Sequence, residues 1–336
     1  MPSDTQIVCS DFDLALTLKS GQVFRWKEES PSVFSGRIGG SPVRVTQRGG
    51  RLRVDGVPHQ QARHFFALDV DLPGMTRRFD VDPVIHSALR QYPGLRVIRQ
   101  DPWECTASFL LSAFNNIVRL TGMLNQLSQC FGRLPGRRDR KGARNPTEVP
   151  RSTSASLVPR YRAGHHGRSA SDALLALPAR GGLACEPFPR PEAIAQASEK
   201  ALRACGLGYR APYLKAVAQK VASGAADLEK WQGLEDDALR EKLLALPGIG
   251  EKVAECILLF GYGRGSAFPV DVWIGRVMRN WYFKRRRKVS DRKIREFALK
   301  HFGPDCGWAQ QYLFCLARWK PELRAPSETS RGRAGA

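Results

Sequence analysis

The stretch Leu246-Pro247-Gly248-Ile249-Gly250-Glu251-Lys252-Val253-Ala254 is the most informative part of this chain. Two glycines flank an apolar residue, and a helix-compatible segment begins directly after them. This pattern is typical of a short hairpin between two helices whose backbone must approach a ligand closely. The N–H groups at the start of the second helix would point at that ligand, and the helix dipole favours an anion there. We therefore predict an anion-binding hairpin at Gly248 and Gly250, and a phosphate diester fits such a site.

Lys252 and Asp271 add chemistry to this hairpin. The helix dipole that attracts an anion also disfavours an ammonium, which favours a neutral and nucleophilic amine. Taken alone, Lys252 reads as a solvated surface charge, and Asp271 reads as the N-cap of a helix that begins at Val272. A phosphate-binding hairpin, an amine on its second helix and a carboxylate at the start of the next helix together predict a catalytic site.

Charge and composition narrow the class of partner. The chain has 336 residues, a formal net charge of +21 and a pI near 10.1. A charge of this size favours a polyanionic partner, with nucleic acid ahead of an anionic membrane surface. No apolar run approaches the length that spans a bilayer, so no membrane partner is expected. The N-terminus has no basic segment followed by an apolar one, and we expect an intracellular protein.

The eight cysteines argue against a metal centre. They are scattered along the chain and no pair has C-x-x-C spacing, so neither a zinc site nor an iron–sulfur cluster is predicted. In a reducing compartment most of them are expected to be small core residues. No side chain is predicted as a metal ligand.

The hydrophobic pattern predicts an α+β fold. Apolar and polar residues alternate in the N-terminal part, which predicts short antiparallel strands at residues 14–18, 33–38, 42–45 and 52–54. From about residue 83 the apolar residues recur at helical spacing, as at residues 107–120, 211–221 and 254–259. We expect an antiparallel sheet domain at residues 1–100 and a larger, mostly helical domain at residues 101–132 and 185–323.

Residues 133–184 interrupt this pattern. They include eleven Lys or Arg against three Asp or Glu and are rich in Ser, Gly and Pro, which predicts a basic, disordered insertion. It either adds non-specific DNA affinity or is a solvated linker. A disordered tail is expected at residues 324–336. The basic run at residues 284–288 could contact a DNA backbone, act as a nuclear localisation signal or be a solvated connection.

Several further blocks accompany the hairpin in a fixed order. After it come the Gly-rich segment Gly261-Tyr262-Gly263-Arg264-Gly265, Pro269 and Asp271. The other blocks are Ser20-Gly21-Gln22-Val23-Phe24-Arg25-Trp26, Asp101-Pro102-Trp103-Glu104-Cys105, Asn115-Asn116-Ile117-Val118-Arg119, Gly206-Leu207-Gly208-Tyr209-Arg210 and Gly307-Trp308-Ala309-Gln310. Together they resemble the 8-oxoguanine DNA glycosylases of the helix-hairpin-helix superfamily over roughly residues 10 to 320. The hairpin Lys marks the bifunctional branch of that superfamily.

The resemblance implies an activity and a role for each matching residue. It implies excision of 8-oxoguanine from duplex DNA, with Lys252 as the nucleophile at C1′, a Schiff base and β-elimination, and with Asp271 stabilising the cationic sugar. The Gly21 carbonyl would accept the N7–H that distinguishes 8-oxoguanine from guanine. The residues implied in holding the flipped base are Gly21, Cys256, Gln310 and Phe314. The residues implied at the orphan base and as the wedge in the stack are Asn115, Arg119, Tyr209 and Arg210. On the family pattern, Gly248 and Gly250 contact DNA phosphate.

Two positions depart from the family pattern. Phe114 stands where the family has the first of three consecutive asparagines, which contacts the estranged cytosine. Trp273 stands where the family has a His that contacts a phosphate beside the flipped nucleotide. Neither change touches Lys252 or Asp271, so we expect activity to be retained and selectivity for the opposite base to be altered.

Two alternatives stay open at this point. The first is a glycosylase of the same superfamily for other oxidised or alkylated bases, and the second is a non-catalytic DNA-binding module. The expected partner is duplex DNA that contains 8-oxoguanine, bound by a monomer in the nucleoid or cytoplasm of a bacterium or in the nucleus of a eukaryote. No cofactor is expected, although backbone carbonyls at the hairpin could hold a structural cation.

Overall fold

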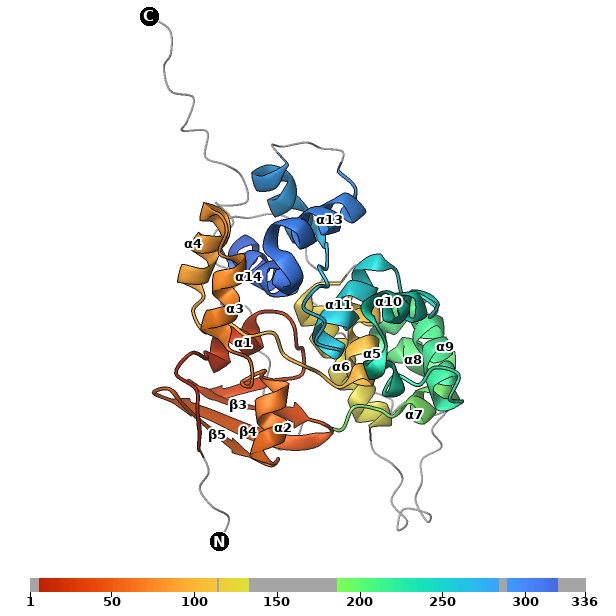
Figure 1. Ribbon diagram of the computed structural model, residues 1–336. Coiled ribbons are helices and arrows are strands. Elements are labelled where there is room, and N and C mark those ends of the chain that lie inside the picture. Colours follow the sequence, from red (N-terminus) through yellow and green to blue (C-terminus); the bar gives the residue numbers. More distant parts are fainter. Residues whose placement is uncertain (1–5, 114, 133–185, 284–288, 320–336) are drawn as a thin grey trace, which may run out of the picture.

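The computed structural model describes residues 6–113, 115–132, 186–283 and 289–319 (Figure 1). Phe114, the insertion at residues 133–184, the basic run at residues 284–288 and the tail at residues 324–336 lie outside the described residues. The predicted α+β class is confirmed, because an antiparallel sheet is followed by a mostly helical region. Within the described ranges, no helix combines the length and the apolar character needed to cross a bilayer.

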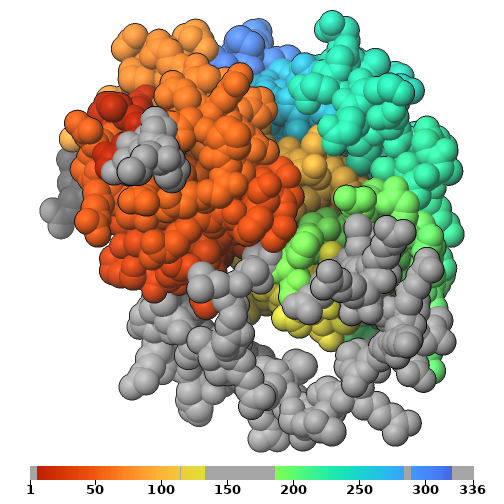
Figure 2. All heavy atoms as spheres, turned by 90° about the horizontal axis from the view of Figure 1, so that it is seen from below, coloured from red at the N-terminus to blue at the C-terminus, as the bar shows by residue number. Residues whose placement is uncertain are grey.

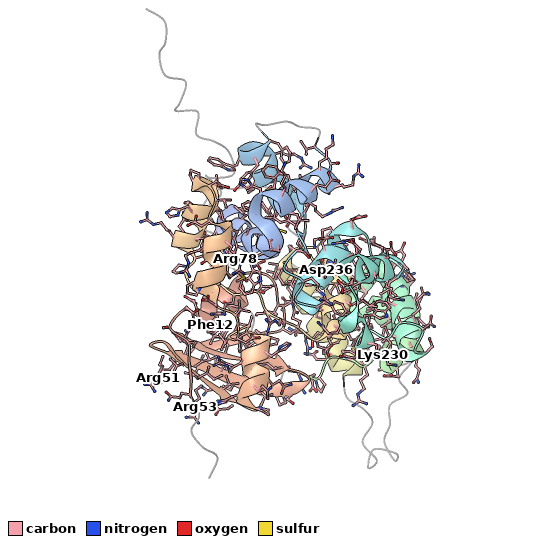
Figure 3. All side chains as sticks on the ribbon, in the orientation of Figure 1. Phe12, Arg51, Arg53, Arg78, Lys230 and Asp236 are labelled. Atoms are coloured by element: carbon pink, nitrogen blue, oxygen red, sulfur yellow. The ribbon has the colours of Figure 1, made fainter. Side chains whose placement is uncertain are left out.

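The sheet has five strands in the order β1-β5-β4-β3-β2, and every neighbouring pair is antiparallel. Its outer face is polar: Arg51 and Arg53 are exposed and point away from the helical region, while Leu52 is buried (Figure 3). The buried face packs against α2 (His59–Phe65). The strands are β1 (Gln6–Val8), β2 (Lys27–Ser30), β3 (Val33–Ile38), β4 (Ser41–Arg48) and β5 (Arg51–Asp55).

The strand prediction was wrong for residues 14–18, which belong to helix α1 (Leu14–Lys19). Asp13 caps this helix, because its Oδ1 atom accepts a hydrogen bond from the Leu16 N–H at 2.8 Å. Leu14 and Leu18 are both buried, as expected for two residues four apart on one helix face. An apolar residue at every second position fitted a strand and a helix, and the cap decides for the helix.

Helices also begin before residue 83. Helices α3 (Leu72–Phe79) and α4 (Pro83–Gln91) pack against α14 (Cys306–Trp319) near the other end of the chain (Figure 1). Arg78 of α3, labelled in Figure 3, forms a 2.6 Å ion pair with Asp305. The hydrophobic core of the helical region therefore extends into the first hundred residues.

The remaining helices form two groups in Figure 1, one around α11 and one around α14. The helical spacing over residues 107–120 predicted one helix, but the first helix ends at Ser112. Asn116 caps a second helix, because its Oδ1 atom accepts a hydrogen bond from the Arg119 N–H at 2.8 Å. These helices are α5 (Pro102–Ser112), α6 (Ile117–Phe131), α7 (Pro191–Gln196), α8 (Glu199–Leu202), α9 (Ala211–Ala222), α10 (Asp236–Leu244), α11 (Glu251–Gly261), α12 (Val272–Val277) and α13 (Asp291–Phe302).

Candidate active site

The predicted hairpin is present between α10 and α11. Gly248 has a φ of +78°, and a Cβ atom there would lie 2.8 Å from the Tyr213 ring, so both the backbone conformation and the packing require glycine. Gly250 is the N-cap of α11, and no side chain caps the helix. A Cβ atom on Gly250 would meet nothing within 4 Å, so space is open in front of it. The start of α11 therefore offers uncapped backbone N–H groups to an anion.

Lys252 points into the protein rather than into solvent. It is half-buried, and its Nζ atom donates a hydrogen bond to the Ser112 Oγ atom at 3.4 Å. The same Nζ atom lies 5.5 Å from the centroid of the Phe109 ring, also on α5. A solvated first-turn lysine would make neither contact, so packing of α5 against α11 fixes the amine in place.

Asp271 ends the loop that follows α11 and caps α12. Its Oδ1 atom accepts a hydrogen bond from the Ile274 N–H at 2.8 Å, as the sequence predicted for an N-cap. Burial raises the pKa of the Asp271 carboxyl above its usual value, while the Ile274 N–H and the charge of Lys252 lower it. The carboxyl is thus close enough to Lys252 to interact with its charge, and it is a stronger base than an exposed Asp.

Cys256 lies one helical turn beyond Lys252 and is 4% exposed. Burial raises the pKa of its thiol to about 11, with Lys252 lowering the value and Asp271 raising it.

Gln310 of α14 is also 4% exposed, and its Nε2 atom donates to the Pro269 carbonyl at 3.2 Å, just ahead of Asp271. Its buried Oε1 atom has no hydrogen-bond partner among the described residues, so it can bond a ligand.

Gly21 and Phe314, which are far apart in the sequence, lie together. Gly21 has a φ of +90°, and a Cβ atom on it would lie 3.2 Å from the Phe314 ring and 3.3 Å from Ile117. The turn is held by the buried Gln22, whose Nε2 atom donates to the Arg96 carbonyl at 2.7 Å and whose Oε1 atom accepts from the Ile98 N–H at 2.6 Å. The Gly21 carbonyl thus belongs to a rigid turn beside a half-buried aromatic ring.

The residues predicted for the orphan base differ in their exposure. The Tyr209 side chain is exposed, on a 3-10 turn at Gly208–Arg210, as a wedge requires. Arg119 is exposed at the start of α6. Arg210 is only 5% exposed, its Nε atom donates to the Ala113 carbonyl at 2.9 Å, and its guanidinium lies 4.3 Å from the Tyr209 ring. Arg210 therefore supports the turn in this conformation.

Asn115 follows the break after α5. Its Nδ2 atom donates to the Leu111 carbonyl at 2.7 Å, and its buried Oδ1 atom has no partner within the described part of the chain. Ser112, the last residue of α5, contacts Lys252, and the next residue, Ala113, contacts Arg210. The catalytic and orphan-base residues predicted from the sequence thus meet at one segment.

Comparisons with known proteins show the family of this chain. Residues 6–106 match the N-terminal domain of 8-oxoguanine DNA glycosylases, and residues 148–304 match the HhH-GPD superfamily of base excision DNA repair proteins. A probable N-glycosylase/DNA lyase of Methanothermobacter thermautotrophicus is 31% identical over 93% of this chain and 96% of its own. The chain belongs to the 8-oxoguanine DNA glycosylase family.

Two further relatives of this glycosylase family are similar over most of their length. The N-glycosylase/DNA lyase OGG1 of Arabidopsis thaliana is 29% identical over 91% of this chain and 77% of its own. The solved 8-oxoguanine glycosylase/lyase of Clostridium acetobutylicum, in complex with duplex DNA containing cytosine opposite 8-oxoguanine, superposes with a TM-score of 0.75 at 27% identity, over 93% of each chain.

For a glycosylase of this family, the residue at position 273 is informative. Trp273 is half-buried, and the Arg276 guanidinium lies 5.4 Å from its ring. Arg276, one turn further along α12, therefore places a positive charge beside Trp273. Phe114, the other departure from the pattern, is outside the described ranges.

A cavity of about 990 Å³ lies elsewhere, between the sheet domain and the region around α7 and α9. Figure 2 shows this side of the molecule, with the N-terminal part in red and orange beside the green segment. The cavity wall includes Trp26, Trp103 and Leu228 but none of the predicted site residues. This glycosylase therefore does not have its candidate active site in that cavity.

Among the described residues, no group of three or more His, Cys, Asp or Glu could hold a metal ion. A metal at the hairpin would depend on backbone carbonyls. The sequence pattern did not indicate three residues that contact Gly21 or Lys252 or hold them in place, which are Gln22, Ser112 and Arg318. Ser20 and Gln22 stood in a block that had been singled out, but no local pattern marks Ser112 or Arg318.

Proposed function

We propose that this protein excises 8-oxoguanine from duplex DNA and then cleaves the strand, as a bifunctional DNA glycosylase and abasic-site lyase in base excision repair. The single observation that supports this best is the Lys252 amine, which lies 3.4 Å from Ser112 and is close enough to the half-buried Asp271 to lower the pKa of its carboxyl. A non-catalytic DNA-binding module would need neither a half-buried amine nor a half-buried carboxylate beside it, so this alternative is disfavoured.

The first chemical step would follow extrusion of the damaged nucleotide. The Lys252 nitrogen forms a bond to C1′ as the bond from C1′ to N9 breaks, and the bonding electrons leave with the base. Asp271 stabilises the developing cationic sugar as a carboxylate, and it then accepts the proton that the nitrogen loses, which its raised pKa favours. Displacement of the base thus needs no metal ligand from the protein.

The second step uses the same amine. The sugar ring opens to give an imine between Lys252 and C1′, and loss of a C2′ proton expels the 3′ phosphate by β-elimination. A water nucleophile could not form this imine, so the lysine accounts for both activities. Uncapped N–H groups at Gly250 and the following turn would hold a phosphate of the same strand.

Selectivity for the base is proposed to rest on four residues. The Gly21 carbonyl would accept the N7–H of 8-oxoguanine, and guanine would place an acceptor against it. Phe314 and Cys256 would lie on the two faces of the base. The unpartnered Oε1 atom of Gln310 supports a hydrogen bond to its Watson–Crick edge. A pocket for alkylated bases would not need an acceptor placed as Gly21 is.

On the opposite strand, Tyr209 would fill the vacated stack, and Arg119, Arg210 and Asn115 would contact the orphan base. The proposed partner is therefore duplex DNA containing 8-oxoguanine, bound by a monomer in the compartment that holds the genome. A structural cation bound by carbonyls of the hairpin around Gly248 is part of the same proposal, and no cofactor is required.

Borohydride trapping tests the proposed function. The wild-type protein and Lys252→Gln are incubated with a duplex carrying one 8-oxoguanine, and the imine is reduced to a stable adduct. We expect an adduct with the wild type and none with the variant, whereas no adduct with the wild type would refute the bifunctional mechanism. A duplex with 3-methyladenine in place of 8-oxoguanine tests the alternative substrate class.

A further inference from the structure

Arg318 lies against the turn that is proposed to read the lesion. It is on the last turn of α14, one turn after Phe314. A Cβ atom on Gly21 would lie 3.0 Å from the Arg318 Nη1 atom and 3.2 Å from the Phe314 ring. The guanidinium and the aromatic ring therefore approach the same glycine, although nearly the whole chain separates them in sequence.

Arg318 is partly buried and keeps its positive charge. Its Nη1 atom donates to the Lys19 carbonyl at 3.3 Å, and the side chain is partly buried. Burial lowers the pKa of the Arg318 guanidinium, but an arginine remains protonated at neutral pH. A partly desolvated cation interacts more strongly with a nearby negative charge than a solvated one does.

The chemistry of the lesion gives this charge a use. In 8-oxoguanine, the N7–H group and the O8 atom are attached to neighbouring ring atoms. From the O8 side of the N7–H contact, rather than the O6 side, a guanidinium that approaches Gly21 can donate to O8. When the bond from C1′ to N9 breaks, the base takes both electrons, and the negative charge spreads over N9 and O8. A guanidinium at O8 would bind the base more strongly as this charge develops, which accelerates the reaction.

We propose that Arg318 is a catalytic and specificity-determining residue that donates a hydrogen bond to O8 of 8-oxoguanine and stabilises the departing base. This rests on the proposed function. Lys252 forms the new bond to C1′, its proton goes to Asp271, the electron pair goes to the base, and solvent protonates N9 after departure. Arg318 stays protonated throughout.

Two substrates separate this role from a structural one. The first is a duplex with 8-oxoguanine opposite cytosine, and the second is the same duplex with a preformed abasic site, which needs Lys252 and Asp271 but has no base to stabilise. For Arg318→Gln we expect single-turnover excision to fall by about tenfold or more, as for loss of one oxyanion donor. Strand cleavage at the abasic site should stay within about twofold of the wild type.

Arg318→Lys keeps the charge without the planar fork, so its excision rate should lie between those of the wild type and Arg318→Gln. Arg292→Gln, at an exposed arginine of α13, is the matched control and should match the wild type on both substrates. Equal losses on both substrates, or no loss on either, would overturn the role of Arg318. Failure of the proposed function would differ, because the wild type itself would not release 8-oxoguanine.

Discussion

The Nζ atom of Lys252 lies 3.4 Å from the Oγ atom of Ser112, the last residue of α5. The next residue, Ala113, accepts a hydrogen bond from Arg210, which supports the turn of the proposed wedge. The end of α5 therefore contacts both the proposed nucleophile, Lys252, and Arg210, which is proposed to contact the orphan base. The end of α5 would thus hold the residues for base extrusion and the nucleophile that attacks C1′ in a fixed relative position.

Ser112→Ala should slow the chemistry without unfolding the protein. A hydrogen bond to a charged group contributes about 1.5 kcal/mol or more, so we expect a loss of about tenfold or more in the single-turnover rate. The amine would keep its place over the Phe109 ring, and borohydride trapping should still occur. Ser108→Ala, at a buried serine one turn earlier on α5, is the control. An unchanged rate in Ser112→Ala would show that the contact has no role in positioning Lys252.

Asp271→Asn separates charge from capping. An asparagine oxygen can still accept from the Ile274 N–H, so α12 should keep its cap, while the carboxylate that assists Lys252 is lost. We expect excision to fall by at least about a hundredfold. The measurement is single-turnover release of 8-oxoguanine, with circular dichroism to verify the fold. Activity near the wild-type level would exclude Asp271 from the mechanism.

Asp271→Asn should also change how the stability of the protein depends on pH. Burial raises the pKa of Asp271 in the folded protein, so ionisation of this group favours the unfolded state. Its contribution to stability is fully present below the unfolded value, near 3.8, and is lost as the pH rises through the folded value. Asp271→Asn should therefore have a higher Tm than the wild type at pH 7, and the difference should shrink as the pH is lowered. A lower Tm at pH 7 would contradict this.

Gly21→Ala tests the turn that is proposed to read the lesion. The φ of +90° costs a residue with a Cβ atom about 1–2 kcal/mol, and the new methyl group would also crowd Phe314 and Ile117. We expect a loss of 8-oxoguanine excision of about tenfold or more, while cleavage of a preformed abasic site is retained. Gly224→Ala is the matched control, because Gly224 has a φ of +77° and open space around it.

The parts of the site that the sequence predicted are those set by local chemistry. Gly250, the positive φ of Gly248 and the Asp271 cap depend on neighbours a few residues away, so their patterns were sufficient. The helix at Leu14–Lys19 was predicted as a strand, because the apolar positions in residues 14–18 fit both the two-residue period of a strand and the 3.6-residue period of a helix. Contacts such as Gly21 with Arg318 join the two ends of the chain, and no local pattern encodes them.

Gln310 and Gln311 illustrate the same limit. Both are buried on α14, yet Gln310 donates to the Pro269 carbonyl and Gln311 donates to the Ser20 carbonyl. One therefore faces the catalytic loop, and its neighbour holds the turn that contains Gly21. The resemblance to the family selected Gln310, whereas composition and spacing alone could not tell the two apart.

Glu255 is expected to position Asp271 through the protein core. This side chain is 1% exposed, accepts from the Arg240 Nε atom at 2.8 Å and accepts from the Phe268 N–H at 2.8 Å. It thus joins the two hairpin helices to the loop that leads to Asp271. Glu255→Ala would leave the buried Phe268 N–H without its acceptor, which costs about 1–3 kcal/mol and should lower the Tm.

A milder variant at the same position tests function apart from stability. Glu255→Gln keeps an acceptor for the Phe268 N–H but turns an uncharged group toward Arg240. We expect kcat for excision to fall more than the affinity for duplex DNA, since the hairpin glycines are untouched. Equal effects on kcat and KM would mean that Glu255 supports the fold alone. Glu229→Gln, outside this network, is the control.

Tyr209→Ala should weaken recognition of duplex DNA without changing the fold. The Tyr209 side chain is 53% exposed, so its removal leaves no cavity in the core. Stacking of one base on an aromatic ring contributes about 1–3 kcal/mol, which predicts a loss of about tenfold or more in kcat/KM on duplex substrates. Leu299→Ala, at a residue that is 49% exposed on α13, is the matched control.

Tyr209→Phe keeps the ring and should retain most of the activity. Fluorescence of a 2-aminopurine beside the lesion should report less extrusion with Tyr209→Ala than with the wild type. If Tyr209→Ala extruded the base as well as the wild type, the wedge role of Tyr209 would have to be abandoned.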